Sequence, residues 1–286
     1  MQNPDGGWGY FPGKKSWLEP TIYAALALHG SAESDRAWKL ISAWQNPDGG
    51  WRPSADVEIS HAATALAVSA AVARGEFGEP FERGVKWLLG TAGNESEFYR
   101  RALVKVGVML GLVEDQRDLS LKAWPWKPDT ASWVEPTAHA LVALKQAAPK
   151  VSESGEQRER VSMSELHERV RMGEAELAEV RCKDGGWNYG NKTARGDDLR
   201  SYPETTGIAL VGLQGRSDLE ASFDLAKRML SETTLPMAKA WLTIAMRVNG
   251  IATEDLTGDA SPDVLITALE ALGAEDGNYQ LLKVAA

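Results

Sequence analysis

Apolar stretches recur along this chain of 286 residues, and each follows a glutamate. They read YAALAL after Glu19, HAATALAV after Glu58, AHALVAL after Glu135 and GIALVGL after Glu204, and Glu97 precedes FYRRALVKVGVMLGL. Segments that carry Ala, Leu and Val on nearly every side are typical of buried helices. We therefore predict inner helices near residues 19–30, 58–74, 97–112, 135–147, 204–214 and 235–249.

Amphipathic segments alternate with these stretches, at residues 34–44, 80–89, 162–180 and 219–230. Their charged residues fall on one side, and Leu, Trp or Ala fall on the other, which predicts an outer layer of helices. A third outer helix near residues 115–122 is short and weak. A last one, near residues 262–273, is predicted to pack beside the first inner helix.

A short repeat marks the joints between these segments. The sequence QNPDGGW stands at residues 2–8 and again at 45–51, and DGGW returns at residues 184–187. The glutamates at positions 19, 58, 97 and 135 lie 39, 39 and 38 residues apart, and a polar insertion at residues 148–165 lengthens the step to Glu204. A period of about 39 residues suits two helices and two connections. The glycines of the turn suit a left-handed helix end.

The second copy also identifies a family. Its pattern of Arg36-Ala37, Trp44-Gln45 and Gly49-Gly50-Trp51 resembles the QW repeat of squalene–hopene cyclases, within the wider prenyltransferase and squalene oxidase repeat proteins. The resemblance covers essentially the whole chain and implies an all-α toroid of six inner and six outer helices. We therefore expect one closed toroid over residues 1–286, with the insertion at 148–165. The repeat is specific for the fold and much less so for function.

Composition narrows the range of partners. A net charge of −9 and a pI near 5.1 argue against a nucleic-acid partner. Cys182 stands alone, which fits a reducing compartment, and no secretory signal or membrane span is visible, so we predict a cytoplasmic protein. Four scattered histidines argue against a metal site, and no cofactor is expected. Contact with a membrane surface and a protein partner stay open, as does a longer native N-terminus, because the chain opens inside a repeat.

The repeat predicts where a ligand would bind. Inner helices that run the same way share one mouth, where their N-termini collect partial positive charge. The loops that lead into this mouth are basic and aromatic, with Tyr10, Phe11, Lys14, Lys15, Trp17, Arg52, Trp124, Trp126, Lys127, Trp133, Tyr189, Lys192, Arg195, Arg200 and Tyr202. This composition suits a long apolar substrate with an anionic head, in contact with Trp133 and Tyr202. Alternatively, the cations are solvated loop charges and the Trp side chains brace the repeats.

One loop resembles a second branch of the family. Lys192, Arg195, Asp198 and Arg200 follow the spacing of a run in protein prenyltransferase β-subunits, whose two basic residues hold the prenyl diphosphate and whose Asp and Cys hold zinc. Arg200 replaces that Cys, and a cation cannot ligate zinc. The resemblance therefore implies diphosphate binding at this loop without a metal.

Class II terpene cyclases offer a third comparison, because they protonate their substrate with an Asp of a D-x-D-D-T motif. Residues 133–137 read WVEPT, which keeps Glu135 and the Thr, whereas Pro136 replaces a carboxylate. Residues 56–60 read DVEIS, with two acids at the matching spacing. Asp56, Glu58 and Glu135 are thus candidate acids. The structural alternative is that a Glu complements the dipole at a helix start, and its repetition at five starts favours that alternative.

Two functions remain open from the sequence. The first is an isoprenoid enzyme, cyclase-like or prenyltransferase-like, acting on a squalene-type or prenyl diphosphate substrate. The second is a non-catalytic toroid that binds an apolar ligand or a protein partner. The loss of the full acid motif and of the zinc Cys favours the second, and the basic cluster and aromatic mouth favour the first. A deep pocket ringed by aromatic side chains would favour the enzyme, because aromatic faces stabilise cations.

Overall fold

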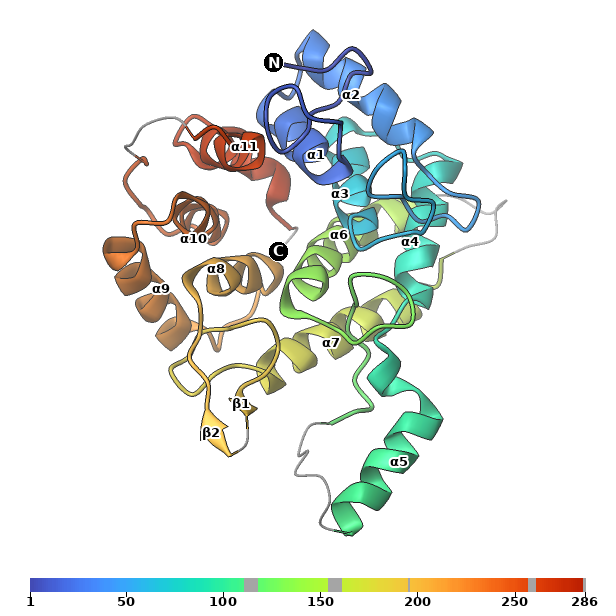
Figure 1. Cartoon of the computed structure of the whole chain (residues 1–286), viewed down its shortest axis with the longest axis vertical. Coiled ribbons are helices and arrows are strands. Elements are labelled where there is room, and N and C mark those ends of the chain that lie inside the picture. Colours follow the sequence, from blue (N-terminus) through green and yellow to red (C-terminus); the bar gives the residue numbers. More distant parts are fainter. Residues whose placement is uncertain (111–117, 154–160, 195, 257–260, 285–286) are drawn as a thin grey trace.

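Six helices form a closed ring in the computed structural model, which describes residues 1–110, 118–153, 161–194, 196–256 and 261–284 (Figure 1). Around the ring they are α1 (Leu18–Ala27), α3 (Thr64–Arg74), α6 (Val134–Glu153), α8 (Pro203–Gly212), α10 (Pro236–Val248) and α11 (Val264–Gly273). Each packs against the next, and α11 closes the ring by contacting both α10 and α1. The prediction of an all-α toroid is confirmed.

An outer layer covers much of this ring. Among the described residues it consists of α2 (Ala32–Ala43), α4 (Glu79–Gly90), α7 (Met163–Glu179) and α9 (Glu220–Glu232). Each outer helix turns one face toward the ring, as α4 does with the buried side chains of Phe81, Val85 and Leu88. Serine side chains begin two of them, since Ser31 and Ser162 accept hydrogen bonds from backbone N–H groups in the first turns of α2 and α7.

Two helices lie in a different layer from the one predicted. The segment predicted as the third inner helix forms α5 (Phe98–Met109), which follows the 3-10 turn η1 (Asn94–Ser96) and lies outside the ring (Figure 1). Met109 is 77% exposed, and Gly107 is the buried residue of this helix. Arg100, Arg101 and Lys105 interrupt its apolar surface, so it cannot be buried on all sides as α3 is. The predicted outer helix α11 instead takes the sixth inner position.

Two smaller predictions concern the connections. Of the weak outer helix predicted at residues 115–122, the described part, 118–122, forms a turn and not a helix, and 115–117 lie outside the described residues. The polar insertion begins as an extension of α6, which continues through Pro149 to Glu153. Residues 154–160 lie outside the described residues, and Ser162 already caps α7.

The repeated turn has the same geometry in each copy. Gly6, Gly49 and Gly185 adopt φ values of +92°, +93° and +97°, a left-handed conformation that favours glycine. In the second copy, Asp48 Oδ1 accepts hydrogen bonds from the Gly50 N–H (3.0 Å) and the Ser60 hydroxyl (2.7 Å). The aspartates of the other two copies, at positions 5 and 184, bind a glycine N–H and a serine in the same way. The aspartates of the repeat are therefore structural.

A hydrogen bond joins each turn to the next inner helix. The buried backbone N–H of Trp51 donates to Thr64 Oγ1 at 2.8 Å, and the indole N–H of the same residue donates to the carbonyl of Ile41 at the end of α2. The backbone bond recurs between Trp8 and Thr21, Trp124 and Thr137, and Trp187 and Thr206. One Trp thus connects the end of an outer helix, the turn and an inner helix. The Thr of the WVEPT segment has this structural role.

The C-terminal segment closes one end of the ring. The 3-10 helix η2 (Asn278–Leu282) packs against α1, α3, α10 and α11. Asn278 donates to the carbonyls of Leu26 and Ala27 at the end of α1, and Gln214 donates to the carbonyl of Leu282. These bonds satisfy C-terminal carbonyls of α1 and fix η2 across the opening. The mouth formed by the helix N-termini is at the other end.

The turn geometry predicts an unequal response to two alanine substitutions. A β-carbon at Gly49 lies 2.7 Å from the carbonyl oxygen of Arg83, whereas one at Gly75, with φ +75°, meets nothing within 4 Å. Gly75→Ala should cost about 1–2 kcal/mol for its left-handed backbone. Gly49→Ala should cost at least about 1 kcal/mol more, because the turn must also separate from α4. Urea denaturation measures both, and equal losses would show that the close approach is unimportant.

Candidate functional site

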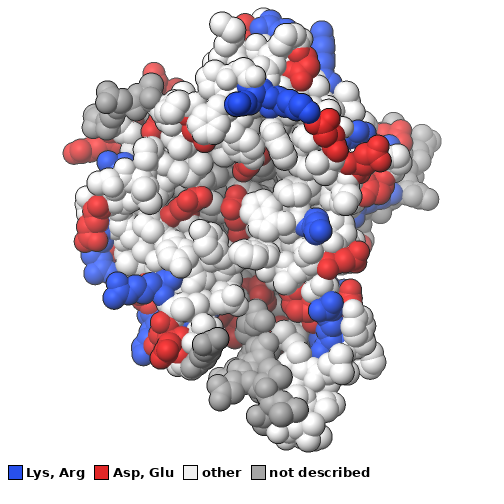
Figure 2. All heavy atoms as spheres, in the orientation of Figure 1, with Lys and Arg blue, Asp and Glu red and all other residues white. Residues whose placement is uncertain are grey.

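The mouth of the ring is acidic at its centre. Glu19, Glu135 and Glu204 occupy the first turns of α1, α6 and α8, and Asp263 caps α11 by accepting a hydrogen bond from the Leu265 N–H at 2.8 Å. Figure 2 shows acidic side chains near the centre of this face, within a largely uncharged surface, and most Lys and Arg side chains toward its edge. The basic mouth expected from the loops is therefore a basic rim around carboxylates.

A pocket of about 280 Å³ opens beside these carboxylates. It is lined by Tyr10, Trp17, Glu19, Pro53, His61, Ala62, Ala63, Leu66, Trp126 and His139. The rings of Tyr10 and Trp17 lie 6.0 Å apart, and those of His61 and Trp126 lie 5.5 Å apart. The pocket therefore combines an aromatic wall with few polar groups, which is typical of small-molecule sites.

Glu19 supplies the carboxyl group among the residues that line this pocket. The phenol of Tyr10 donates a hydrogen bond of 2.6 Å to Glu19 Oε2. Burial, followed by the charge of Glu135, raises the pKa of Glu19 to about 7, although the Tyr10 hydrogen bond and His139 act in the opposite direction. Burial and Glu135 also raise the pKa of Glu204. Glu19 is therefore partly protonated at neutral pH, unlike a carboxyl group in water.

Two histidines face the same pocket in different ways. His61 accepts a hydrogen bond at Nδ1 from the Ala63 N–H (3.3 Å), and burial lowers its pKa, so the ring is neutral. His139 lies one turn after Glu135 on α6, and its Nε2 is 3.6 Å from Glu135 Oε1. Behind His139 are the rings of Tyr23 and Trp241, at 6.4 and 5.7 Å.

The three candidate acids of the sequence separate in space. Glu135 belongs to the central carboxylates, next to His139. The side chain of Asp56 is 66% exposed and pairs with Lys15 at 2.6 Å, and Glu58 is also exposed, so neither lines the pocket. Sequence reasoning missed Glu19 as a site residue. Its signal was the equivalence of WLEPT, at residues 17–21, to the WVEPT segment of Glu135, because equivalent helix starts meet at one mouth.

The basic run at residues 192–200 includes an exposed β-hairpin of β1 (Thr193–Ala194) and β2 (Asp197–Asp198). Lys192 pairs with Glu179 and Asp198 with Lys183, each at 2.9 Å, and Arg200 is exposed. Arg195 lies outside the described residues. Two of the charged side chains in the run are therefore already engaged in ion pairs within the protein, and the prediction of a diphosphate site stays a prediction.

This hairpin is an insertion into the repeat. The bonded Trp and Thr are 13 residues apart in three copies and 19 apart between Trp187 and Thr206. The Leu199 N–H donates to the carbonyl of Lys192 at 2.8 Å, so the ends of the six intervening residues meet.

The aromatic candidates lie nearby at the rim, where Tyr189 contacts both Trp133 (6.0 Å between rings) and Tyr202 (5.2 Å).

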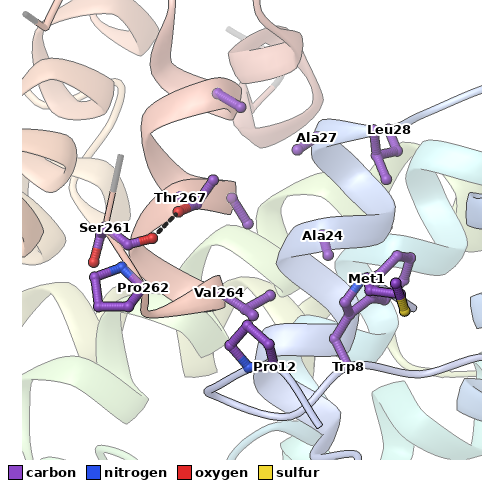
Figure 3. Close-up of a pocket in the computed structure, with 12 residues that line it drawn as sticks. Met1, Trp8, Pro12, Ala24, Ala27, Leu28, Ser261, Pro262, Val264 and Thr267 are labelled. Carbon is purple, nitrogen blue, oxygen red and sulfur yellow. Dashed lines mark hydrogen bonds between the residues drawn. The ribbon is translucent and has the colours of Figure 1, made fainter. Parts of the chain in front are cut away.

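A second pocket, of about 320 Å³, lies between α1 and α11 (Figure 3). Ala24, Ala27 and Leu28 form one wall, and Val264 and Thr267 lie on the facing helix (Figure 3). The polar contact drawn there is local, since the Thr267 hydroxyl donates to the carbonyl of Ser261 at 3.0 Å. Its lining residues carry no ionisable side chain, so it offers no acid–base chemistry.

Metal and membrane features are absent from the described part of the chain. No group of three or more His, Cys, Asp or Glu side chains there is placed to hold a metal ion. None of the helices in that part combines the length and apolarity that a membrane crossing requires.

Comparisons with known proteins identify the fold. No protein-family model matches the sequence, and no curated protein matches it. Solved structures of the type II terpene cyclase MstE from Scytonema do match: the ligand-free form has a TM-score of 0.52 at 16% identity over 95% of this chain and 74% of that one. An MstE variant in complex with its substrate geranylgeranyl dihydroxybenzoate gives 0.51 at 18% identity, over 98% and 74%. A protein from Actinoplanes gives 0.51 at 20% identity, over 94% and 74%. The chain thus has a terpenoid cyclase-like fold.

The raised pKa of Glu19 predicts a pH-dependent stability. The folded chain holds this proton up to about pH 7, whereas the unfolded chain releases it near 4.5. Stability should therefore fall as pH rises through this window, because the folded state binds more protons there. Between pH 4.5 and pH 8 this group should lower the stability of the wild type by about 2–3 kcal/mol. Glu19→Gln should remove that part of the slope, whereas the part due to the raised pKa of Glu204 should remain. Urea denaturation across pH measures the slope, which should persist in Asp56→Asn.

The hairpin insertion predicts a tolerated deletion. Removing residues 193–198 restores the spacing of 13 between Trp187 and Thr206. The deletion joins Lys192 to Leu199, which are already hydrogen-bonded to each other. The unfolding free energy should therefore change by less than about 1 kcal/mol. Removing residues 53–58 instead leaves too few residues between Trp51 and Thr64, and the chain should fail to fold. Circular dichroism and thermal melts test both deletions, and unfolding by the first would contradict this view of the loop.

Proposed function

We propose that this protein binds a short isoprenoid in the pocket at the mouth and cyclises it, with Glu19 as the proton donor. The observation that carries this proposal is a carboxyl group that keeps a proton near neutral pH inside an aromatic pocket. A general acid must hold its proton at the working pH and sit within reach of the reacting group. Glu19 meets the first condition and lines the pocket that would hold the substrate.

The proposed step needs one proton and no cofactor. The Glu19 O–H bond breaks, and its proton joins a terminal double bond or epoxide of the substrate. The double bond then supplies its electron pair to the new C–H bond, or the epoxide opens to a hydroxyl group, and positive charge develops on carbon. The faces of Trp17, Trp126 and Tyr10 would stabilise that charge as it moves along the chain. Glu19 is left as a carboxylate.

Pocket size and charge support a particular class of substrate. A volume of about 280 Å³ is slightly below the roughly 300–1,000 Å³ of ligand sites, which favours a short prenyl chain over squalene. The central carboxylates would repel a diphosphate, so we propose an uncharged head group. The prenylated substrate named for the structurally similar MstE variant supports an isoprenoid ligand. The alternative, a non-catalytic toroid, would bind the same class of ligand unchanged.

The test is turnover of farnesol that carries a terminal epoxide, followed by mass spectrometry of the extracted products. The wild type should form a cyclic product, and Glu19→Gln should reduce its rate by a factor of about 10² or more, the usual contribution of a general acid. Asp56→Asn is the matched control, because this surface carboxylate should be replaceable without loss. The wild-type rate should fall as pH rises through about 7, since Glu19 then loses its proton.

Two results would overturn the proposal. Full activity in Glu19→Gln would remove Glu19 as the acid. Saturable binding of the epoxide by the wild type, without any product, would favour the non-catalytic alternative.

A further inference from the structure

His139 is a buried residue whose Nε2 has no hydrogen-bond partner among the described residues. Its side chain is only 8% exposed and lines the pocket. Leaving a buried polar atom unpaired costs on the order of 1–3 kcal/mol, and such groups in a native fold call for an explanation. The surroundings of the ring point to a chemical role.

The neighbouring carboxylate suits His139 to accept a proton. Glu135 Oε1 lies 3.6 Å from Nε2, beyond hydrogen-bond distance but close enough that hydrogen on Nε2 is preferred to a lone pair beside the carboxylate. This tautomer leaves the lone pair of Nδ1 as the acceptor. Proton uptake at Nδ1 would place an imidazolium beside the carboxylate of Glu135, an arrangement found in other base–carboxylate pairs. Tyr23 and Trp241 confine the ring on its inner side.

We propose that His139 is the base that ends the reaction, an inference that rests on the proposed function. A C–H bond next to the cationic carbon of the cyclised substrate breaks, and its electron pair forms a C=C bond. The proton passes to Nδ1 of His139. Glu135 is a positioning residue in this step, because it acts through the imidazole. The product is an uncharged alkene.

The same arrangement restores the enzyme. After the reaction His139 carries the proton and Glu19 carries the negative charge, and both line one pocket. Return of the proton from His139 to Glu19 completes the cycle, so no proton is consumed. His61 cannot replace His139 without rearrangement, because its Nδ1 already accepts a hydrogen bond from the Ala63 N–H.

The experiment compares His139→Gln with His167→Gln, using the epoxide of farnesol as the probe. His139→Gln should still consume the epoxide, because Glu19 is intact, but the share of the wild-type alkene among the products should fall at least tenfold. Water should instead capture the cation as an alcohol, or a different C–H bond should break. His167→Gln is the control, because this histidine is exposed on α7 and does not line the pocket, and it should keep the wild-type product ratio. Glu135→Gln should shift the ratio in the same direction as His139→Gln, and it tests the inference if His139→Gln does not fold.

The outcomes separate this inference from the proposed function. An unchanged product ratio in folded His139→Gln and Glu135→Gln, together with an inactive Glu19→Gln, would overturn the base and leave the acid in place. Normal activity in Glu19→Gln, or no product from the wild type, would overturn the proposed function and this inference with it. A merely structural role of His139 would lower the overall rate without altering the ratio of products.

Discussion

The hydrogen bond from a Trp backbone N–H to a Thr hydroxyl organises this molecule. It joins a repeated turn to the first residues of an inner helix, at Thr21, Thr64, Thr137 and Thr206. The N–H is buried, and without this partner its desolvation would be uncompensated. Because every copy makes the same bond, each of these four inner helices enters the ring with its first turn facing the same end. The mouth is therefore a direct result of the repeat.

That shared orientation explains why weakly acidic groups gather there. A glutamate two residues before the Thr is an ordinary helix-start residue when taken alone. Glu19 and Glu135 come from equivalent positions, and Glu204 comes from the first turn of a third inner helix. In the ring these groups approach one another in a partly dehydrated space, and their mutual repulsion adds to the effect of burial. Proton affinity in this site is thus a property of the assembled ring.

The sequence allowed the prediction of the toroid, its repeat boundaries and most of its helices, because apolar periodicity and the DGGW turns are local signals. It did not show that α5 leaves the ring and that α11 enters it, since this depends on how well each helix packs against its neighbours, which for α11 are α1 and α10. Among the candidate site residues, Glu135 was selected for its motif. Asp56 was selected for its spacing from Glu58. In the structure its side chain is exposed and forms an ion pair with Lys15. The WLEPT segment could have pointed to Glu19, but its raised pKa and the surroundings of His139 depend on tertiary neighbours that no local pattern reveals.

The hairpin of β1 and β2 has a wider consequence for how such a molecule can diversify. Six additional residues between Trp187 and Thr206 leave the Trp–Thr bond and the helix it anchors unchanged. The length of this loop can therefore change without a change in the ring of helices. Selection can lengthen, shorten or recharge these loops, and so alter which molecules reach the pocket, while the scaffold that sets proton affinity stays the same. In this architecture, substitutions in the loops can change access to the pocket without changing the helix positions that raise the pKa of Glu19.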